Sequence, residues 1–340
     1  MKIGRIALAS AVAMVAAVAS VSSANAQQLK RINIGTNPAG SSYFLLASGF
    51  AKLFQEKLDI RSTAQPHAGS SVYLPLMDTG EIVLGLNNSL DSGMAIAGKA
   101  PYSAPLKNVR IIARIWVLPY AYITKDSSGI RSMDDLRGKR VAVKVKTNVS
   151  LEQANETMLS TAGFKSEAVD AVDSGGVVEG INMVVEDRAV AATVSLTMPA
   201  LRQAHATIPG GIRVVPLGEK GTSEFLDAGM PGLYAMTIKP SPTLPFIKED
   251  TLISAFDTYL NAGSTVTDED AYVLVKTLHT NWADLQKDYP PLRGLQANEL
   301  APAANTAPYH PGAIKYFKEI GIWTAENEAR QASVMAIIGN

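Results

Sequence analysis

The feature that most constrains the fold is a run of short strands alternating with amphipathic helices, and the chain contains this run twice. In the first run, residues 31–36, 60–64 and 81–86 are predicted strands, and residues 43–58 are a helix with one apolar stripe. The second run extends over residues 139–217. Strands that alternate with helices indicate a parallel sheet covered on both faces. The predicted fold class is therefore α/β, with two doubly wound lobes.

Two segments interrupt the alternation and are predicted to cross between the lobes. Residues 109–124 form a long apolar stretch that contains Pro119. Such a stretch is too long for one strand in one sheet, and a proline removes a hydrogen bond from the ladder, so we interpret it as a strand that passes into a second domain. The proline cluster at residues 239–245 ends regular structure and is suited to the return crossing.

The segments after the return crossing are predicted to be helices, namely residues 246–261, 268–282 and 312–320. Their apolar stripes need a sheet to cover, and the first lobe supplies it. The predicted domains are a first lobe of residues 27–119 and 238–340 and a second lobe of residues 120–237. A ligand cleft is expected between them, since clefts between domains are favoured ligand sites.

The N-terminal residues have the pattern of a secretory signal peptide. Lys2 and Arg5 precede an apolar run over residues 6–21, which ends in Ala24-Asn25-Ala26. A positive start, an apolar core and an A-x-A end predict cleavage after Ala26, with residues 1–26 removed, and hence a soluble periplasmic protein. An uncleaved membrane anchor is the alternative, but the run is short for a spanning helix.

Composition excludes several classes of function. The chain has 340 residues and no cysteine, which rules out disulfides, thiolate catalysis and cysteine-bound zinc. The 31 basic and 31 acidic side chains balance, so nothing supports a nucleic-acid partner. The four histidines lack metal-ligand spacing and no nucleotide-binding motif occurs, so neither a metal nor a cofactor is predicted.

Candidate binding residues lie in the turns between strands and helices. The segment Ala-Gly-Ser-Ser occurs twice, at residues 39–42 and 68–71, each time after a strand and before a helix. Helix N-termini attract anions and strand ends line the crevice of an open sheet, so these turns are candidate ligand sites, or else ordinary helix caps. Lys144 and Lys146 share one face at the end of another strand; one of them is predicted to pair with a ligand carboxylate, or both are solvated.

Four motifs give the chain a resemblance to a known family. Residues 32–43 resemble the pattern I-x-I-G-T-G-x-x-G-G-x-Y-Y, and residues 63–89 resemble T-A-x-x-x-G-G-S…G-E…L…Q-N. Residues 132–143 are similar to S-L-x-D-L-x-G-K-R-V-A-V, and residues 310–317 to H-P-G-A…Y-Y. Together these motifs resemble the TAXI-type solute receptors of TRAP (tripartite ATP-independent periplasmic) transporters.

The resemblance implies a type II periplasmic-binding-protein fold with two hinge strands. It also implies a receptor that hands a small organic anion, such as a dicarboxylate or an acidic amino acid, to TRAP membrane subunits. Carried over by position, the first-lobe half of the site is Thr36, Gly40, Ser41, Ser42, Tyr43, Gly69, Ser70 and Asn88. His67 is added because it lies in a predicted cleft turn.

The second-lobe half of the site departs from the family pattern. The family has a Gly/Pro/Ser-rich loop after V-A-V, whereas this chain has Lys144 and Lys146 there, which favours a more anionic ligand. The candidate residues in this lobe are Lys146, Asn148, Ser150, Ser195 and Thr197.

Two other functions are kept as alternatives. One is a receptor, expected like the first to be a monomer, that serves another importer or a sensor kinase. The other is a periplasmic serine hydrolase with Ser41 or Ser70 as nucleophile, which needs a general base within hydrogen-bond reach; His67 is the nearest histidine in the sequence.

Overall fold

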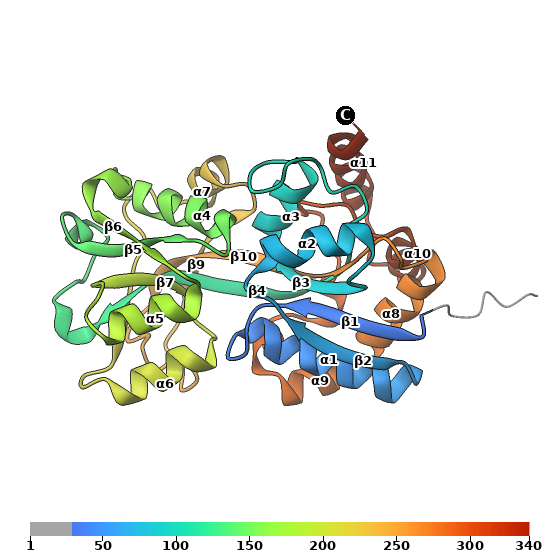
Figure 1. Cartoon of the computed structure of the whole chain (residues 1–340), viewed down its shortest axis with the longest axis horizontal. Helices are drawn as coiled ribbons and strands as arrows, with labels where there is room; N and C mark the ends of the chain where they lie inside the picture. Colours follow the sequence, from blue (N-terminus) through green and yellow to red (C-terminus); the bar gives the residue numbers. More distant parts are fainter. Residues whose placement is uncertain (1–28, 340) are drawn as a thin grey trace, which may run out of the picture.

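The computed structural model describes residues 29–339, so the predicted signal peptide and its cleavage site lie outside the described residues. Two similar halves are arranged side by side (Figure 1). The first lobe begins with three strand–helix pairs: β1 (Arg31–Thr36), α1 (Ser42–Leu58), β2 (Arg61–Pro66), α2 (Ser70–Thr79), β3 (Leu84–Asn88) and α3 (Ser89–Ile96). The second lobe has three more: β5 (Arg140–Val145), α4 (Val149–Ser160), β6 (Asp170–Ser174), α5 (Val177–Val185), β7 (Ala191–Ser195) and α6 (Pro199–Thr207).

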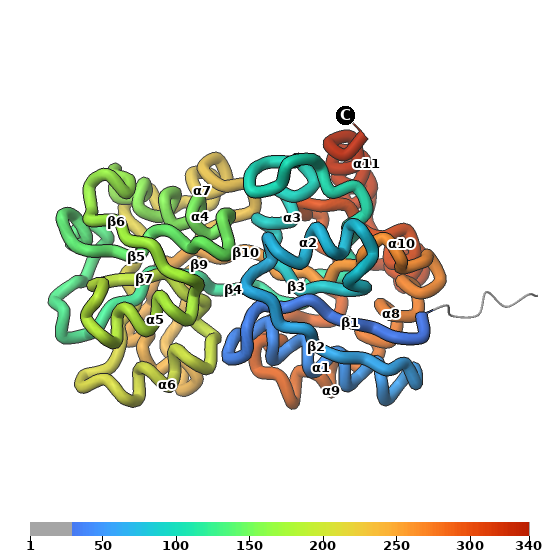
Figure 2. The backbone as a smooth tube through the Cα atoms, in the orientation of Figure 1, coloured from blue at the N-terminus to red at the C-terminus, as the bar shows by residue number. Residues whose placement is uncertain are grey.

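Two long strands join the lobes, β4 (Arg110–Lys125) and β10 (Thr251–Ala262). The remaining elements of the second lobe are β8 (Ile212–Val215), α7 (Ser223–Gly229) and β9 (Leu233–Ile238). The C-terminal helices return to the first lobe: α8 (Asp268–Thr280), α9 (Trp282–Asp288), α10 (Pro311–Glu319) and α11 (Ala325–Gly339). The blue and the orange-to-red parts of the chain accordingly share one half, and the green and most of the yellow parts form the other (Figure 2).

The strands form one mixed sheet with the order β2-β1-β3-β10-β4-β7-β5-β6, while β8 pairs with β4 and β9 with β10. β1 pairs in parallel with β2 and β3, and β5 in parallel with β6 and β7. β10 and β4 are antiparallel to each other and to the strands beside them. Each lobe thus has three parallel strands followed by one antiparallel crossing strand, which confirms the predicted doubly wound α/β fold.

The prediction of a helix over residues 246–261 is wrong, because this segment contains β10. Every residue of β10 except Leu252 is buried, since the strand lies in the middle of the sheet and is covered on both faces. An apolar run that is buried on both faces lacks the alternation of a half-exposed strand, and periodicity alone does not distinguish it from a buried helix. The return crossing is therefore β10 itself and not the proline cluster before it.

The expectation that residues 109–124 are too long for one strand in one sheet is wrong, because β4 runs as one strand of 16 residues through Pro119 and lies in a single sheet. The Pro119 carbonyl accepts a hydrogen bond from the Leu196 amide, and pairing of β4 with β7 begins one residue later, at Tyr120. In a strand the N–H and C=O of one residue point to the same side. The N–H that Pro119 lacks would therefore point beyond the end of β7, where the ladder has no acceptor for it.

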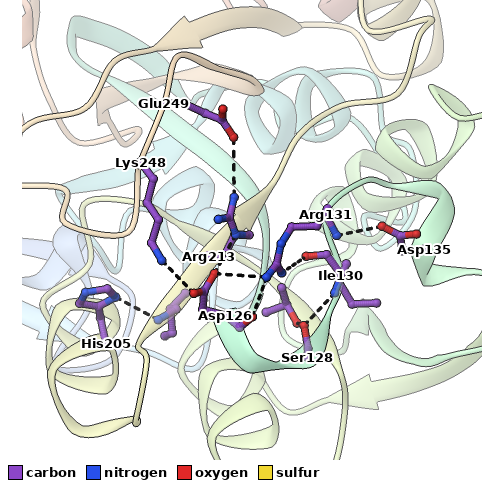
Figure 3. A network of polar contacts seen from close by, with 11 residues as sticks. Asp126, Ser128, Ile130, Arg131, Asp135, His205, Arg213, Lys248 and Glu249 are labelled. Carbon is purple, nitrogen blue, oxygen red and sulfur yellow. Dashed lines mark hydrogen bonds and ion pairs between the residues drawn. The ribbon is translucent and has the colours of Figure 1, made fainter.

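Away from the strand–helix turns, a cluster of charged side chains ties the end of β4 to the segment before β10 (Figure 3). The Asp126 carboxylate accepts hydrogen bonds from Arg213 Nε at 2.8 Å and Lys248 Nζ at 2.9 Å, and Arg131 lies 3.8 Å away. Hydrogen bonds from Lys248 and Arg213 lower the pKa of Asp126 from 3.8 to about 2.

We expect Asp126→Asn to lower the free energy of unfolding by about 1 kcal/mol at neutral pH, because the charge partners of Lys248 and Arg213 are lost. Since the pKa of Asp126 is lower in the folded state, its contribution is present above pH 4 and disappears as the pH falls towards 2. Urea unfolding of both proteins at pH 6 and pH 2 measures this. Asp187→Asn, which removes the exposed partner of Lys125, is the control with the smaller effect. A difference that persists at pH 2 would contradict the assignment.

Among residues 29–339, no helix is both long and apolar enough to span a membrane.

Candidate functional site

A cleft with two adjoining parts lies between the lobes. The parts have cavity volumes of about 40 Å³ and about 250 Å³. Both are lined by residues of the first lobe, such as Asn37 and Ser41, and of the second, such as Asn148 and Val177. A cleft with walls from two lobes is a favoured place for a small-molecule ligand.

All six helices that follow parallel strands begin at this cleft. The lining residues that cap or open these helices are Ser41 and Ser42 for α1, Gly69 for α2, Asn88 for α3, Asn148 for α4, Gly176 and Val177 for α5, and Met198 for α6. The sequence favours these starts, since Ser and Asn accept hydrogen bonds from the helix backbone. The side chains of Ser41, Asn88 and Asn148 cap Phe44, Asp91 and Leu151 in this way. The N-terminal ends of six helix dipoles give the cleft a positive potential without any cationic side chain.

The two crossing strands carry the apolar floor of the cleft. Trp116, Leu118 and Tyr120 alternate along β4, so they face the same side of the sheet, and Phe256 of β10 is the register partner of Leu118. The rings of Tyr120 and Phe256 are 5.3 Å apart. Tyr43, at the start of α1, meets Trp116 edge to face at 6.1 Å. Burial raises the pKa of both tyrosine hydroxyls, which are therefore neutral at physiological pH.

The lobes touch each other across the cleft through polar groups. Asn148 of the second lobe donates from Nδ2 to Ser70 Oγ and to Asp91 Oδ2 of the first, both at 3.1 Å. The hydroxyls of Ser42 and Thr197 are 3.4 Å apart. Gly69 lies so close to Thr147 that a Cβ atom there would be 2.0 Å from the Thr147 carbonyl oxygen. These contacts describe a closed arrangement of the two lobes.

Asp91 is the buried charge at the centre of these contacts, and the sequence did not single it out. It is fully buried, and Oδ2 accepts hydrogen bonds from Ser70 and Asn88 as well as Asn148. Burial raises the pKa of Asp91, while these hydrogen bonds oppose the rise. Oδ1 has no hydrogen-bond partner among the described residues. The spacing of Asn88 and Asp91, which matches a helix cap and its third residue, was the available indication.

Half of the predicted site residues line the cleft: Ser41, Ser42, Tyr43, Gly69, Asn88, Asn148 and Ser195. Three more support these from behind. Ser70 donates to Asp91, Ser150 donates to Asn148 Oδ1 at 2.8 Å, and Thr197 lies 3.1 Å from the Ser195 hydroxyl. Thr36 is fully buried at the end of β1, and its hydroxyl has no partner in the described part of the chain.

The structure does not bring Gly40, His67 or Lys146 to the cleft. Gly40 is exposed and has a φ of 88°, which a turn before α1 requires. Lys146 is exposed because it alternates with the buried Val145, and its ammonium pairs with Asp173 at 3.0 Å. Lys144 is exposed on the same face. The expectation that these lysines make the cleft more basic therefore lacks support from the geometry.

His67 is half-buried against the ring of Tyr73, 5.6 Å away, and burial lowers its pKa. No hydrogen bond in the described residues joins it to Ser41 or Ser70. The Ser41 hydroxyl caps α1, and the Ser70 hydroxyl donates to Asp91. The arrangement of base and nucleophile that the hydrolase alternative needs is not formed by these residues. Residues 29–339 also contain no group of three or more His, Asp or Glu side chains placed to hold a metal ion.

Sequence reasoning missed the apolar half of the cleft. In the smaller part of the cleft, the lining residues it did not identify as site residues are Asn37, Trp116, Leu118, Tyr120, Leu151, Val177, Met198 and Phe256. Most of them belong to apolar runs in which a side chain that faces a ligand and one that faces the core have the same pattern. Only the position of β4 and β10 between the two lobes shows which of these side chains face the cleft and which face the core.

Comparison with solved structures shows the fold. Periplasmic binding protein BugD aligns with a TM-score of 0.57 at 13% identity, over 91% of this chain and 96% of that chain. A structure described as a periplasmic transporter aligns with a TM-score of 0.54 at 15% identity, over 91% and 97%. The alkanesulfonate-binding protein SsuA from Xanthomonas axonopodis pv. citri, bound to MOPS, aligns with a TM-score of 0.50 at 15% identity, over 91% and 84%. The chain therefore has the periplasmic-binding-protein fold.

Comparison with curated protein sequences gave no match. The sequence pattern of the NMT1-like family, in contrast, matches residues 34–321, which extend from β1 to the end of α10 and include every residue that lines the cleft. The chain belongs to the NMT1-like family.

Proposed function

We propose that this protein is a periplasmic receptor that captures a small organic anion between its lobes by hinge closure and breaks no bond. The observation that carries the proposal is the convergence of six helix N-termini on one cleft between two lobes. Backbone N–H groups and the positive ends of the helix dipoles there offer an anion the partners that it loses on leaving water. The serine hydroxyls of Ser41, Ser42 and Ser195 add neutral donors.

The hinge in this proposal is the pair β4 and β10, which are the strands that pass from one lobe to the other. The first lobe is proposed to comprise residues 27–119 and 238–340, and the second residues 120–237. Closure brings Asn148 to Asp91 and Ser70, so the closed form is held by contacts that do not involve the solute. A solute that contacts both lobes binds the closed form more tightly than the open form, so binding and closure favour each other.

We further propose that the receptor is of the TAXI type and acts as a monomer that docks transiently on TRAP membrane subunits. The support for this subtype is the resemblance of the four sequence motifs. A receptor for another importer or for a sensor kinase has the same fold and would use the same cleft. Pull-down of the exported protein with its membrane partner distinguishes them: a multi-span TRAP subunit supports the proposal, and an ATPase-linked permease or a kinase contradicts it.

Native mass spectrometry of the purified protein tests the receptor function. We expect a mass above that of the polypeptide by one small acid, which is lost on denaturation. A panel of organic acids should then raise the melting temperature of protein freed of this solute, since a ligand at 100 times its dissociation constant adds about 2.7 kcal/mol. If no solute is retained and no acid shifts the melting temperature, the protein is not such a receptor.

A further inference from the structure

The lining of the cleft is almost free of charged side chains, although its backbone favours an anion. Neither part of the cleft is lined by a lysine or an arginine among the described residues, and its one acidic lining residue is Glu179, in the larger part. The nearest candidate cation from the sequence, Lys146, is turned outward and paired with Asp173. An anion in this cleft is therefore held by neutral donors and helix dipoles alone.

Helix dipoles and hydroxyl groups can compensate only a limited amount of negative charge. They compensate one desolvated carboxylate where they converge, but a second ionised group needs its own partners or must stay in water. The buried carboxylate of Asp91 lies directly behind Asn88 and Asn148, which line the cleft, so a second anionic group on that side would face a like charge. The opposite side is the apolar floor.

The floor is built for a flat apolar body. Trp116, Tyr120 and Phe256 line the smaller part of the cleft and are at most 2% exposed, so the free space beside their rings is small and its wall is aromatic. Aromatic side chains stack favourably on other rings, edge to face or offset. The floor also lies on the crossing strands, so a ring placed there contacts both lobes.

We propose that the ligand is an organic monoanion with an aromatic body, whose anionic group lies at the helix N-termini and whose ring lies against Trp116 and Phe256. This inference rests on the proposed receptor function and narrows it, because it excludes dicarboxylates and acidic amino acids as preferred solutes. The single anionic group uses the donors that the cleft has, and the ring occupies the part of the cleft that cannot solvate a charge.

Calorimetric titration of solute-free protein with matched acids tests this. The aromatic monoanions are benzoate, phenylacetate and benzenesulfonate. The competing class is represented by succinate, glutarate and L-glutamate, and acetate is the control anion that has no aromatic ring. We expect the best aromatic monoanion to bind at least 100-fold more tightly than every dicarboxylate and than acetate. Tighter binding of a dicarboxylate or of glutamate overturns the inference while the receptor function stands. If no acid binds and no solute is retained, both fail.

Tryptophan fluorescence locates the ring. The chain has three tryptophans, and among them Trp116 alone lines the cleft. An aromatic monoanion should change the emission of the wild type and of Trp323→Phe, whose indole packs on Tyr309 outside the cleft. In Trp116→Phe the affinity measured by calorimetry should fall, because the ring loses part of its stacking surface, and the emission change should be absent at acid concentrations that saturate the variant. A change that persists in Trp116→Phe and disappears in Trp323→Phe contradicts the placement of the ring.

Discussion

Gly69→Ala is expected to yield a folded protein whose lobes cannot meet. The added Cβ atom would lie 2.0 Å from the carbonyl oxygen of Thr147, which belongs to the other lobe. Backbone atoms cannot rotate away as a flexible side chain can, so the closed arrangement is blocked. Gly69 has an extended φ of 178°, which alanine adopts without strain, so stability of the open form should change by only about 0.5 kcal/mol. Affinity for the solute should fall by about 100-fold or more, since the closed state is no longer populated.

Gly175→Ala is the matched control for this variant. Gly175 also lines the cleft, but a Cβ atom there has open space around it. Calorimetric titration should therefore give this variant an affinity close to that of the wild type. Small-angle scattering with saturating solute adds a second measurement: the radius of gyration should decrease for Gly175→Ala and stay constant for Gly69→Ala. Equal affinities for the two variants would show that closure does not bring Gly69 and Thr147 together.

Asn148→Asp is expected to cause the next largest loss of affinity for the solute, and it does so by adding a charge and not by changing the shape of the side chain. Aspartate caps a helix as well as asparagine does, so the start of α4 is preserved. The Nδ2 donor, however, is replaced by an oxygen that faces Asp91 Oδ2 at 3.1 Å inside a buried contact. Two buried carboxylates at this distance disfavour the closed form by about 3 kcal/mol, or about 100-fold in affinity at pH 7. Calorimetric titration with the solute retained by the wild type measures this loss.

The double variant Asp91→Asn with Asn148→Asp separates repulsion from damage to the fold. It exchanges the amide and the carboxylate across the lobe contact and restores one donor facing one acceptor. We expect affinity to recover by at least about 10-fold relative to Asn148→Asp alone, because the like charges are gone. Affinity in the double variant that is no better than in Asn148→Asp would mean that Asn148 acts only within its own lobe.

The parallel part of the fold could be predicted because its signals are local. A strand, a small polar turn and an amphipathic helix follow one another, and Ser41 and Asn148 stand where the backbone needs a cap. The same regularity places the turns at one edge of each half-sheet, so seven predicted residues reach the cleft.

The rest of the site depends on contacts between distant segments. Trp116 and Phe256 come together only through the antiparallel register of β4 and β10, which are separated by more than a hundred residues. The surroundings of Lys146 depend on distant residues for a related reason: the alternation of β5 gives the face of the side chain but not its ion-pair partner, Asp173 of β6. The local spacing of Asn88 and Asp91 indicates a helix cap, but the contact of Asp91 with the other lobe depends on Asn148, which is 57 residues away.

The position of β10 in the sheet also governs how the chain assembles. β3 ends at Asn88 and β4 begins at Arg110, so the two strands are near neighbours in sequence, yet they do not pair, because β10 lies between them. Until residues 251–262 are available, β3 presents an unpaired edge, whereas β4, β5, β6 and β7 of the other lobe already pair with one another. The strands β4 to β7 can thus reach their native pairing early, whereas β3 completes its pairing only after β10 has been added. Completion of the solute cleft is accordingly a late, long-range event in folding.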